Sequence, residues 1–424
     1  MAEQVVGIDF GTTNSAIAVV GDDGEPELIG PLRSILHFHP ERREASGRLV
    51  PAVGPAAIDG WLESQGEGRL IQSTKSFLAS RLFLSTNIFG TVLSLQTLVG
   101  YIVRELRERA AERFGGIGTR AVVGRPVCFA GAAAASDEEL ALRRLRAALL
   151  EAGFREVRFE YEPVAAAWHF ERSLDADALV LIGDFGGGTS DFSLVRVGPR
   201  RLRAGRRDEG ILGNAGVALA GDAFDGKIVR HLVSPRLGRG DEFRSLFGRV
   251  LPVPTFLYGH LERWNHVSFL RSRKTLQLLY DLRREALEPG PLGALLHLVE
   301  NDLGFQLYRA VQETKLELSE RPQGRFAFSD PPLEIDVEVA RASFEEWIRE
   351  ELDAIAACVD GLLARCGVAP GDVDRVFLTG GSSLVPAVRR IFAERFGPEL
   401  IASGAEFTSI ARGLALSALR DAPA

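Results

Sequence analysis

The chain has 424 residues, of which 46% are apolar and 25% charged, a composition typical of a globular protein too long for one simple core. Its 50 basic and 57 acidic residues leave a formal net charge of −7, which gives no sign of nucleic-acid binding. No apolar run reaches about 18 residues, and the chain does not start with a basic segment followed by an apolar one. We therefore expect a cytoplasmic protein with neither a membrane span nor a secretory signal.

The sequence predicts two lobes. The first lobe, residues 1–172, opens with an apolar strand at residues 5–8 that ends at Asp9, and the loop Asp-Phe-Gly-Thr-Thr-Asn-Ser occupies residues 9–15. The spacing of apolar residues predicts its further elements. In chain order these are a helix at 91–114, a strand at 121–129 and a helix at 138–152 that ends before Gly153.

The second lobe, residues 173–424, repeats this opening. An apolar strand at 178–183 ends at Asp184, and the loop Asp-Phe-Gly-Gly-Gly-Thr-Ser-Asp occupies residues 184–191. Residues of about 226–310 are expected to form a variable subdomain, whose sequence is irregular over 234–305. Its helices either carry exposed charge on a solvated face or form a docking surface for a partner. The other predicted elements are a strand at 192–197, helices at 224–233, 306–319 and 344–366, a strand pair at 325–339, a strand at 376–380 and a helix at 408–419.

Both loops have the composition of a phosphate-binding turn. Glycine lets the backbone approach a ligand closely, and successive backbone N–H groups of such a turn bind anions. The hydroxyl groups of Thr12, Thr13 and Thr189 add donors. An aspartate beside a phosphate implies a divalent cation, so Asp9 and Asp184 are expected to hold Mg²⁺. Ordinary hairpin turns use the same residue types, but two such loops, each after a buried strand, favour one ligand held from both sides.

Several segments, in order along the chain, resemble the ATPase domain of the 70-kilodalton heat-shock (DnaK-type) chaperone family. They are residues 5–15, 121–129, 162–167 (Glu-Pro-Val-Ala-Ala-Ala), 221–225 (Gly-Asp-Ala-Phe-Asp) and 378–386 (Leu-Thr-Gly-Gly-Ser-Ser-Leu-Val-Pro). The resemblance covers about residues 4 to 418 and is greatest to the short, YegD-like bacterial members. It implies an α/β protein with the actin-like ATPase fold, in which two ribonuclease H-like lobes hold ATP or ADP.

The same resemblance assigns catalytic roles. Asp9 and Asp184 would hold Mg²⁺ through water molecules, Lys75 would stabilise charge on the transferring phosphate, and Glu162 would orient the attacking water. Asp184 would accept the proton of that water. Lys75 could instead be a surface lysine, and the Glu-Pro pair at 162–163 also suits a helix start. The residues expected to contact the phosphates are Gly11, Thr12, Thr13, Asn14, Gly186, Gly187, Gly188 and Thr189.

The adenosine-binding residues implied by the resemblance depart from the family pattern. Leu316 replaces an arginine that stacks on adenine, Leu384 replaces a basic residue, and Gln312 replaces a glutamate. Losing a guanidinium over the ring removes roughly 0.5–2 kcal/mol, which predicts nucleotide binding that is weaker or less selective for the base. The full expected set is Gly221, Gln312, Lys315, Ser319, Gly380, Gly381, Ser382 and Ser383.

Three functions remain open at this point. The first is a slow ATPase of chaperone type that acts on unfolded or client proteins with a co-chaperone. The second is a nucleotide-dependent scaffold with little turnover, and the third is a small-molecule kinase of the sugar-kinase type, for which no motif specifies a catalytic aspartate base. Because the chain ends at Ala424, just after the predicted closing helix, we expect it to lack the family's peptide-binding domain.

Overall fold

We analysed a computed structural model of the chain, which describes residues 5–418 apart from 22, 65, 204–207, 246 and 404–407. The chain forms two compact units. Unit 1 comprises Met1–Ala220, Ala354–Leu384 and Val388–Ala424, and unit 2 comprises Gly221–Asp353 and Val385–Ala387. Within the described residues, no helix combines the length and apolar character needed to cross a membrane.

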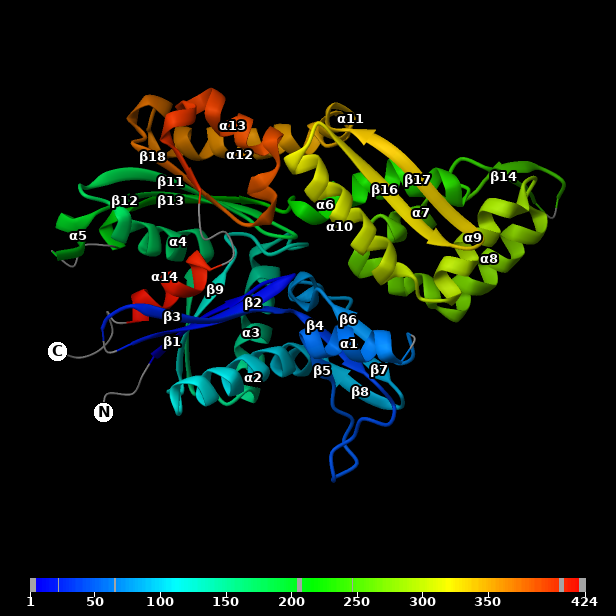
Figure 1. Cartoon of the computed structure of the whole chain (residues 1–424), viewed down its shortest axis with the longest axis horizontal. Coiled ribbons are helices and arrows are strands. Elements are labelled where there is room, and N and C mark those ends of the chain that lie inside the picture. Colours follow the sequence, from blue (N-terminus) through cyan, green and yellow to red (C-terminus); the bar gives the residue numbers. More distant parts are fainter. Residues whose placement is uncertain are drawn as a thin grey trace. The chain divides into compact units, whose positions relative to one another are not determined.

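Unit 1 contains two five-stranded sheets with the same topology (Figure 1). In each sheet the first three strands along the chain are antiparallel neighbours, and the last two add in parallel beside the first. The first sheet has the order β10-β9-β1-β2-β3, with bounds Glu156–Tyr161, Arg120–Arg125, Val5–Phe10, Asn14–Val20 and Pro26–Arg33. The second has the order β13-β12-β11-β18-β19, with bounds Ile211–Val217, Ser190–Val197, Ala178–Phe185, Arg375–Thr379 and Ile401–Ser403.

This duplication is the actin-like arrangement that the sequence predicts, and the fold class is confirmed. The strands β1 and β11 occupy equivalent places in the two sheets, and each leads into one of the glycine loops. The duplicated topology therefore places the two loops at equivalent positions. The predicted boundary between lobes at residue 172 is a different division from that of the compact units and stays a prediction, because unit 1 holds both sheets.

Two helices lie between the sheets of unit 1, as Figure 1 shows: α4 (Glu162–Phe170) and α14 (Ser409–Ala418). The first packs on β11 and β12, the second on β1 and β2, and the two helices pack on each other. A Cβ atom at Gly413 would lie 1.7 Å from the carbonyl oxygen of Ala165, and one at Gly7 would lie 2.2 Å from the backbone nitrogen of Ala415. Glycine at these positions allows the close approach of helix to helix and of helix to sheet.

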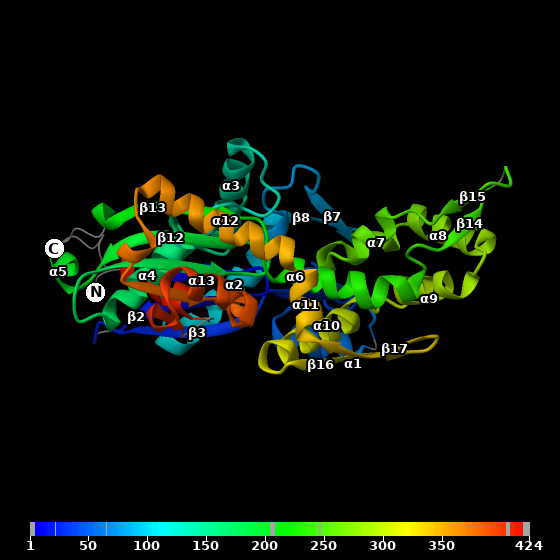
Figure 2. The same ribbon diagram turned by 90° about the horizontal axis from the view of Figure 1, so that it is seen from above.

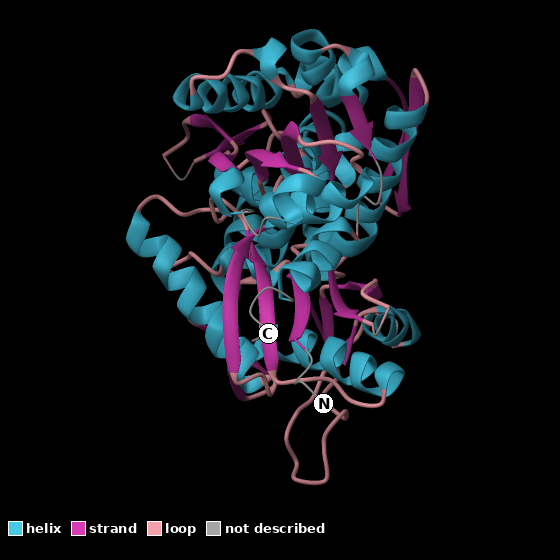
Figure 3. Cartoon of the chain, turned by 90° about the vertical axis from the view of Figure 1, so that its left-hand side faces the viewer, coloured by secondary structure: helices cyan, strands magenta, loops and turns pink. Residues whose placement is uncertain are grey.

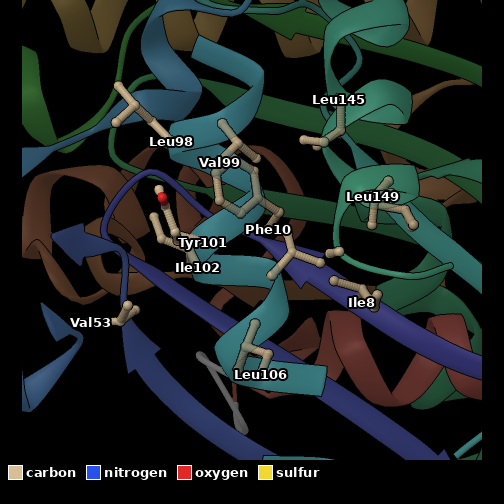
Figure 4. Close-up of a cluster of buried hydrophobic side chains, with 14 of the residues drawn as sticks. Ile8, Phe10, Val53, Leu98, Val99, Tyr101, Ile102, Leu106, Leu145 and Leu149 are labelled. Atoms are coloured by element: carbon tan, nitrogen blue, oxygen red, sulfur yellow. The ribbon is translucent and has the colours of Figure 1, made fainter. Parts of the chain in front are cut away.

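Helices α2 (Leu95–Phe114) and α3 (Ala135–Glu151) cover the other face of the first sheet. Figure 4 shows Ile8 and Phe10 of β1 pointing into a cluster with side chains of α2 and α3. On the second sheet, Phe392 of α13 (Pro386–Phe396) contacts the rings of Phe185 and Phe192. Figure 3 separates these helices from the strands by colour. Both sheets are thus buried on their two faces, which explains why β1 and β11 are near-continuous apolar runs.

A smaller part of unit 1 carries the segment around residue 75. It consists of α1 (Pro55–Glu63) and the short strands β4 (Ile35–Phe38), β5 (Ala52–Val53), β6 (Arg69–Gln72), β7 (Ser85–Ile88) and β8 (Thr91–Ser94). The helical turn η1 (Thr74–Phe77) follows directly after β6. Strand β6 pairs with β4, so the segment that enters η1 belongs to a small sheet.

Unit 2 is mainly helical and carries two hairpins. The hairpin of β16 and β17 lies beside α10, which Figure 2 shows from above. Its elements are α6 (Gly221–Ile228), the π-helical turn Val229–Val233, β14 (Glu242–Arg244), β15 (Val250–Pro252), α7 (Phe256–Leu261), α8 (Arg273–Glu285), α9 (Pro289–Glu300), α10 (Gly304–Glu320), β16 (Gln323–Asp330), β17 (Leu333–Ala340) and α11 (Arg341–Trp347).

Some predicted elements differ in extent or kind. The predicted helix at 91–114 begins only at Leu95, because Ser94 ends β8 and accepts the Thr97 N–H as the helix cap. The strand predicted at 121–129 ends at Arg125, before a proline that cannot donate to the ladder. The predicted helix at 344–366 is two helices, α11 and α12 (Arg349–Cys366). The region 234–305, for which the sequence predicts helices without bounds, contains α7, α8 and α9.

Candidate functional site

The first glycine loop is a tight hairpin turn between β1 and β2, in which Phe10 pairs with Ser15. The Gly11 N–H donates to the Ser15 hydroxyl at 3.2 Å, and that hydroxyl lies 2.8 Å from the Ser34 hydroxyl. Ser34 in turn donates to the Gly11 carbonyl at 2.8 Å. A Cβ atom at position 11 would lie 2.0 Å from the Asn14 carbonyl oxygen, so the turn requires glycine there. Two serines therefore hold the backbone of this loop in one shape.

The second loop connects β11 to β12 in the same way, with Phe185 paired with Ser190. The Gly186 N–H donates to the Thr189 carbonyl at 2.9 Å. At the end of β18, Gly380 has a φ of 84°, and a Cβ atom there would lie 2.2 Å from the Phe185 carbonyl oxygen. Both loops are thus hairpin turns, as the simpler interpretation of the sequence held. That geometry is compatible with phosphate binding, because the turns leave short glycine-rich segments between the paired residues.

A cluster of carboxylates lies beside the two loops. Asp9 is in β1, Glu162 begins α4, and Asp184 is cross-strand neighbour to Asp191 in the β11–β12 ladder. The last three are 5% exposed or less. The one ammonium among them is that of Lys75, whose Nζ lies 2.6 Å from Glu162 Oε1. Lys75 is therefore not a surface lysine, since its side chain is only 10% exposed.

The mutual proximity of these groups changes their proton affinities. Burial and the nearby Glu162 carboxylate raise the pKa of Asp9 to about 7, against the opposing effect of Lys75. Burial and Glu162 likewise raise the pKa of Asp191 to about 7, although hydrogen bonds from Thr189 and a backbone N–H lower it. Burial, Glu162, Asp191 and Asp9 raise the pKa of Asp184 well above its usual range. These influences show that residues from both sheets share one electrostatic environment.

For the ammonium of Lys75, burial and the neighbouring carboxylates act on the pKa in opposite directions. Burial lowers the pKa of Lys75, but Glu162 and Asp9 raise it by more, so the net change is upward. Lys75 therefore carries its charge at neutral pH. Four carboxylates around one ammonium leave an excess of negative charge, which protons or a bound cation can compensate.

The donor set fits Mg²⁺ bound chiefly by water and phosphate. Across the part of the chain that the structure describes, no three histidine, cysteine, aspartate or glutamate side chains form a group that could hold a metal ion. A closed protein cage of that kind suits other metals, whereas Mg²⁺ keeps several waters and takes one or two carboxylates plus phosphate oxygens. Asp9 and Asp184, whose pKa values are raised by burial and by neighbouring carboxylates, could supply these carboxylates in their ionised form.

The residues expected to bind adenosine are divided between the two units. In unit 1, Gly381–Leu384 forms a helical turn after β18, and the Ser383 hydroxyl donates to the Gly380 carbonyl at 2.6 Å. Ser382 and Ser383 are buried, whereas Leu384 is exposed. This turn adjoins the second glycine loop through Gly380, as the contact with the Phe185 backbone shows.

In unit 2, α10 presents the rest of the expected adenosine set. Lys315 Nζ lies 2.6 Å from Asp225 Oδ1 and 3.5 Å from the Gly221 carbonyl oxygen, so two segments predicted separately come together. The Ser319 hydroxyl donates to the Lys315 carbonyl, one turn earlier in the helix. Gln312 is partly buried, and Leu316 is 53% exposed. The assignment of these residues to adenosine stays a prediction.

Three residues of the site region were not assigned a role from the sequence. Asp191 lies within the second loop segment, and its spacing from Asp184 was a usable signal, because paired positions of a tight hairpin face each other. Ser34 is far from Gly11 along the chain and has no motif of its own. Arg144 of α3 looks in the sequence like any other arginine of a charged helix.

Comparison with known proteins indicates the same class of protein as the fold does. A family model described as Hsp70 protein matches residues 300–419. The chain is 27% identical over 413 residues to "Chaperone protein DnaK" of Thermosipho melanesiensis, which covers 94% of this chain and 56% of the relative. It is 25% identical over 434 residues to "Chaperone protein DnaK" of Thermotoga neapolitana, which covers 98% of this chain and 59% of the relative. The chain thus spans somewhat more than half the length of these curated relatives.

The duplicated sheets and the paired loops define a protein of the actin-like ATPase class. Within that class, the chain is similar to proteins of the 70-kilodalton heat-shock family, at 25–27% identity over most of its length.

Proposed function

We propose that the chain binds ATP and ADP together with Mg²⁺ and hydrolyses ATP slowly. The observation that carries this proposal is the buried Lys75–Glu162 pair, which shares one electrostatic environment with Asp9 and Asp184 at the ends of equivalent strands. Phosphoryl transfer needs positioning and charge stabilisation more than covalent chemistry. The buried ammonium of Lys75 beside these carboxylates would supply the charge stabilisation, and the two glycine turns would supply the positioning.

The two turns would hold the phosphate chain. Backbone N–H groups of Gly186, Gly187 and Gly188 and the Thr189 hydroxyl would bind it from the second sheet, and residues 11–14 would bind it from the first. Asp9 and Asp184 would hold Mg²⁺ through its waters. When bound, that ion supplies positive charge to the phosphate oxygens and orients them.

The remaining groups would act on the attacking water. The Glu162 carboxylate accepts a hydrogen bond from Lys75 through one oxygen, and its other oxygen could orient a water molecule. Burial and the neighbouring carboxylates raise the pKa of Asp184, which makes its ionised form a stronger base toward the proton of that water. The Lys75 ammonium would stabilise the charge that develops on the transferring phosphate.

In this proposed site, the protein would contact the nucleotide base more weakly than it contacts the phosphates. The exposed side chain of Leu316 and that of Leu384 offer apolar contact only. We therefore propose that nucleotide affinity depends chiefly on the phosphates and on Mg²⁺, with reduced preference for adenine. At the level of the cell, we propose a chaperone-like role in the cytoplasm with client proteins and a co-chaperone as partners, by analogy with the family.

Hydrolysis of ATP by the purified chain tests the proposal. Asp184→Asn should abolish turnover, and the matched variant Asp175→Asn, which changes an exposed aspartate three residues before β11 begins, should leave it unchanged. Turnover that survives Asp184→Asn would refute the site assignment. ATP binding without turnover would favour the scaffold function, and phosphate transfer only in the presence of a sugar would favour a kinase.

A further inference from the structure

A single buried guanidinium ties the Lys75 segment to helix α3. Arg144 is 4% exposed, and its two terminal nitrogens donate to four backbone carbonyls. Nη1 lies 3.3 Å from the Phe77 oxygen and 2.8 Å from those of Leu78 and Ser80, and Nη2 lies 3.1 Å from the Phe83 oxygen. One side chain therefore gathers the backbone of residues 77–83 at one point.

This arrangement is unusual for a buried charge. Among the described residues, no acidic side chain forms an ion pair with Arg144, so carbonyl dipoles alone replace its water shell. Burial lowers the pKa of Arg144, but the ordinary pKa of arginine is so high that the charge persists. Only a planar guanidinium has several donors fixed in a fork that can reach carbonyls lying side by side. Lysine has the charge but not this geometry.

The segment that Arg144 holds contains a strained residue. Ser73, just before η1, has a φ of 55° and is fully buried, a conformation that residues with a Cβ atom rarely adopt. The Ser76 N–H donates to the Ser73 carbonyl, and the Leu78 N–H donates to the Lys75 carbonyl. Such a turn persists only when the surrounding structure enforces it. Arg144 enforces the conformation of this turn by donating to the carbonyls of Phe77 and Leu78, two and three residues beyond Lys75.

We propose that Arg144 is a positioning residue that fixes the η1 turn so that the Lys75 ammonium stays on Glu162. This inference rests on the proposed ATPase function for its consequence, but its structural content does not depend on nucleotide. Arg144 contacts no reacting atom. It acts through the backbone of Lys75, and a shift of about 1 Å at a catalytic group can cost about 10²-fold in rate.

A purely structural role makes a different prediction. If Arg144 only stabilised the fold, its loss would lower the melting temperature and leave the folded fraction fully active. A positioning role lowers kcat while KM for ATP stays close to that of the wild type, because the glycine turns that bind the phosphates are held by other residues. The two roles are therefore separable in one set of kinetic and thermal measurements.

The test uses three variants and a matched control. Arg144→Met removes the donors, Arg144→Lys keeps the charge, and Arg144→Ala leaves room for free guanidinium. Arg146→Met is the control, since Arg146 is on the same helix but exposed, with one bond to the Val157 carbonyl. We expect at least about a tenfold loss of kcat for all three changes at position 144, partial rescue of the alanine variant by millimolar guanidinium, and normal activity of the control.

A second readout needs no nucleotide. In the free wild-type protein, the buried Lys75 amine should be acetylated far more slowly than the exposed Lys274, measured residue by residue by mass spectrometry. Arg144→Met and Arg144→Lys should accelerate acetylation of Lys75 and leave Lys274 unchanged. Unchanged Lys75 reactivity, or normal kcat in the folded variants, would overturn the inference. If the wild type turns over no ATP but Lys75 is still acetylated faster in the variants than in the wild type, only the ATPase proposal is refuted.

Discussion

The partly buried carboxylate of Asp9 should make the protein less stable as the pH rises, and Asp9→Asn should relieve that effect. Burial and Glu162 raise the pKa of Asp9 from 3.8 to about 7. Between these two values the folded state keeps a proton that the unfolded state has released. Stability therefore falls as the pH rises through this range and levels off above the folded pKa.

The size of the effect follows from the shift. A shift of about three pKa units lowers the free energy of unfolding by about 4 kcal/mol at pH 8, relative to low pH. At pH 5 the same shift lowers it by only about 1.7 kcal/mol. Asparagine has the shape of aspartate but no charge to bury. Relative to the wild type, Asp9→Asn should therefore be more stable at pH 8 by up to about 4 kcal/mol, with a smaller advantage at pH 5.

Urea unfolding at the two pH values, without Mg²⁺ or nucleotide, measures this difference. Asp137→Asn is a suitable control, because hydrogen bonds from Arg81 and from the Ala133 and Ala134 backbone lower the pKa of Asp137. A lowered pKa stabilises the fold at every pH above the unfolded value, so the control should lose the same small amount at pH 5 and pH 8. A wild type equally stable at both values, or an Asp9→Asn advantage that does not grow with pH, would refute the reasoning.

Three further changes test other parts of the site. Lys75→Met should lower ATP turnover by about 10²–10³-fold and destabilise the fold by about 3–5 kcal/mol, since it leaves a buried carboxylate unpaired. Steady-state kinetics measure the first effect and urea unfolding measures the second. A fully active variant would contradict the catalytic role of Lys75. Gly380→Ala should cost about 1–3 kcal/mol or more, because of its positive φ and its contact with the neighbouring strand, whereas Gly371→Ala, in open space, should be neutral in the same unfolding assay. Ser34→Ala should cost about 1–3 kcal/mol and weaken ADP binding measured by calorimetry; unchanged affinity would show that the first loop keeps its shape without this hydroxyl.

The sequence predicted the parts of this protein that depend on local pattern. The apolar runs before Asp9 and Asp184 are buried strands, because each sheet is covered on both faces. Each strand is followed by a glycine loop, and the turn at Gly11 requires glycine because it leaves no room for a Cβ atom. The helix α10 was predicted nearly to its ends, since its apolar residues recur at helical spacing.

What the sequence did not show depends on contacts between distant segments. No helix bounds were predicted within residues 234–305, although Pro289 is at the favoured first position of α9. No helix-breaking residue marks the interruption at Ile348 between α11 and α12. Ser34 and Arg144 gained their roles from partners far along the chain. Family resemblance gave Lys75 and Glu162 separate roles, but their pairing was not predicted, because 87 residues separate them and no local pattern connects them.

The central claim is that this protein holds a nucleotide by its phosphates, between two glycine turns, with Mg²⁺. Calorimetric titration of the purified chain with ADP, GDP and adenosine, each with and without Mg²⁺, tests it most directly. We predict that adenosine binds at least about tenfold more weakly than ADP, that removing Mg²⁺ weakens ADP binding, and that GDP binds within about tenfold of ADP. Equal affinity for adenosine and ADP, or nanomolar and strictly adenine-specific binding, would contradict it.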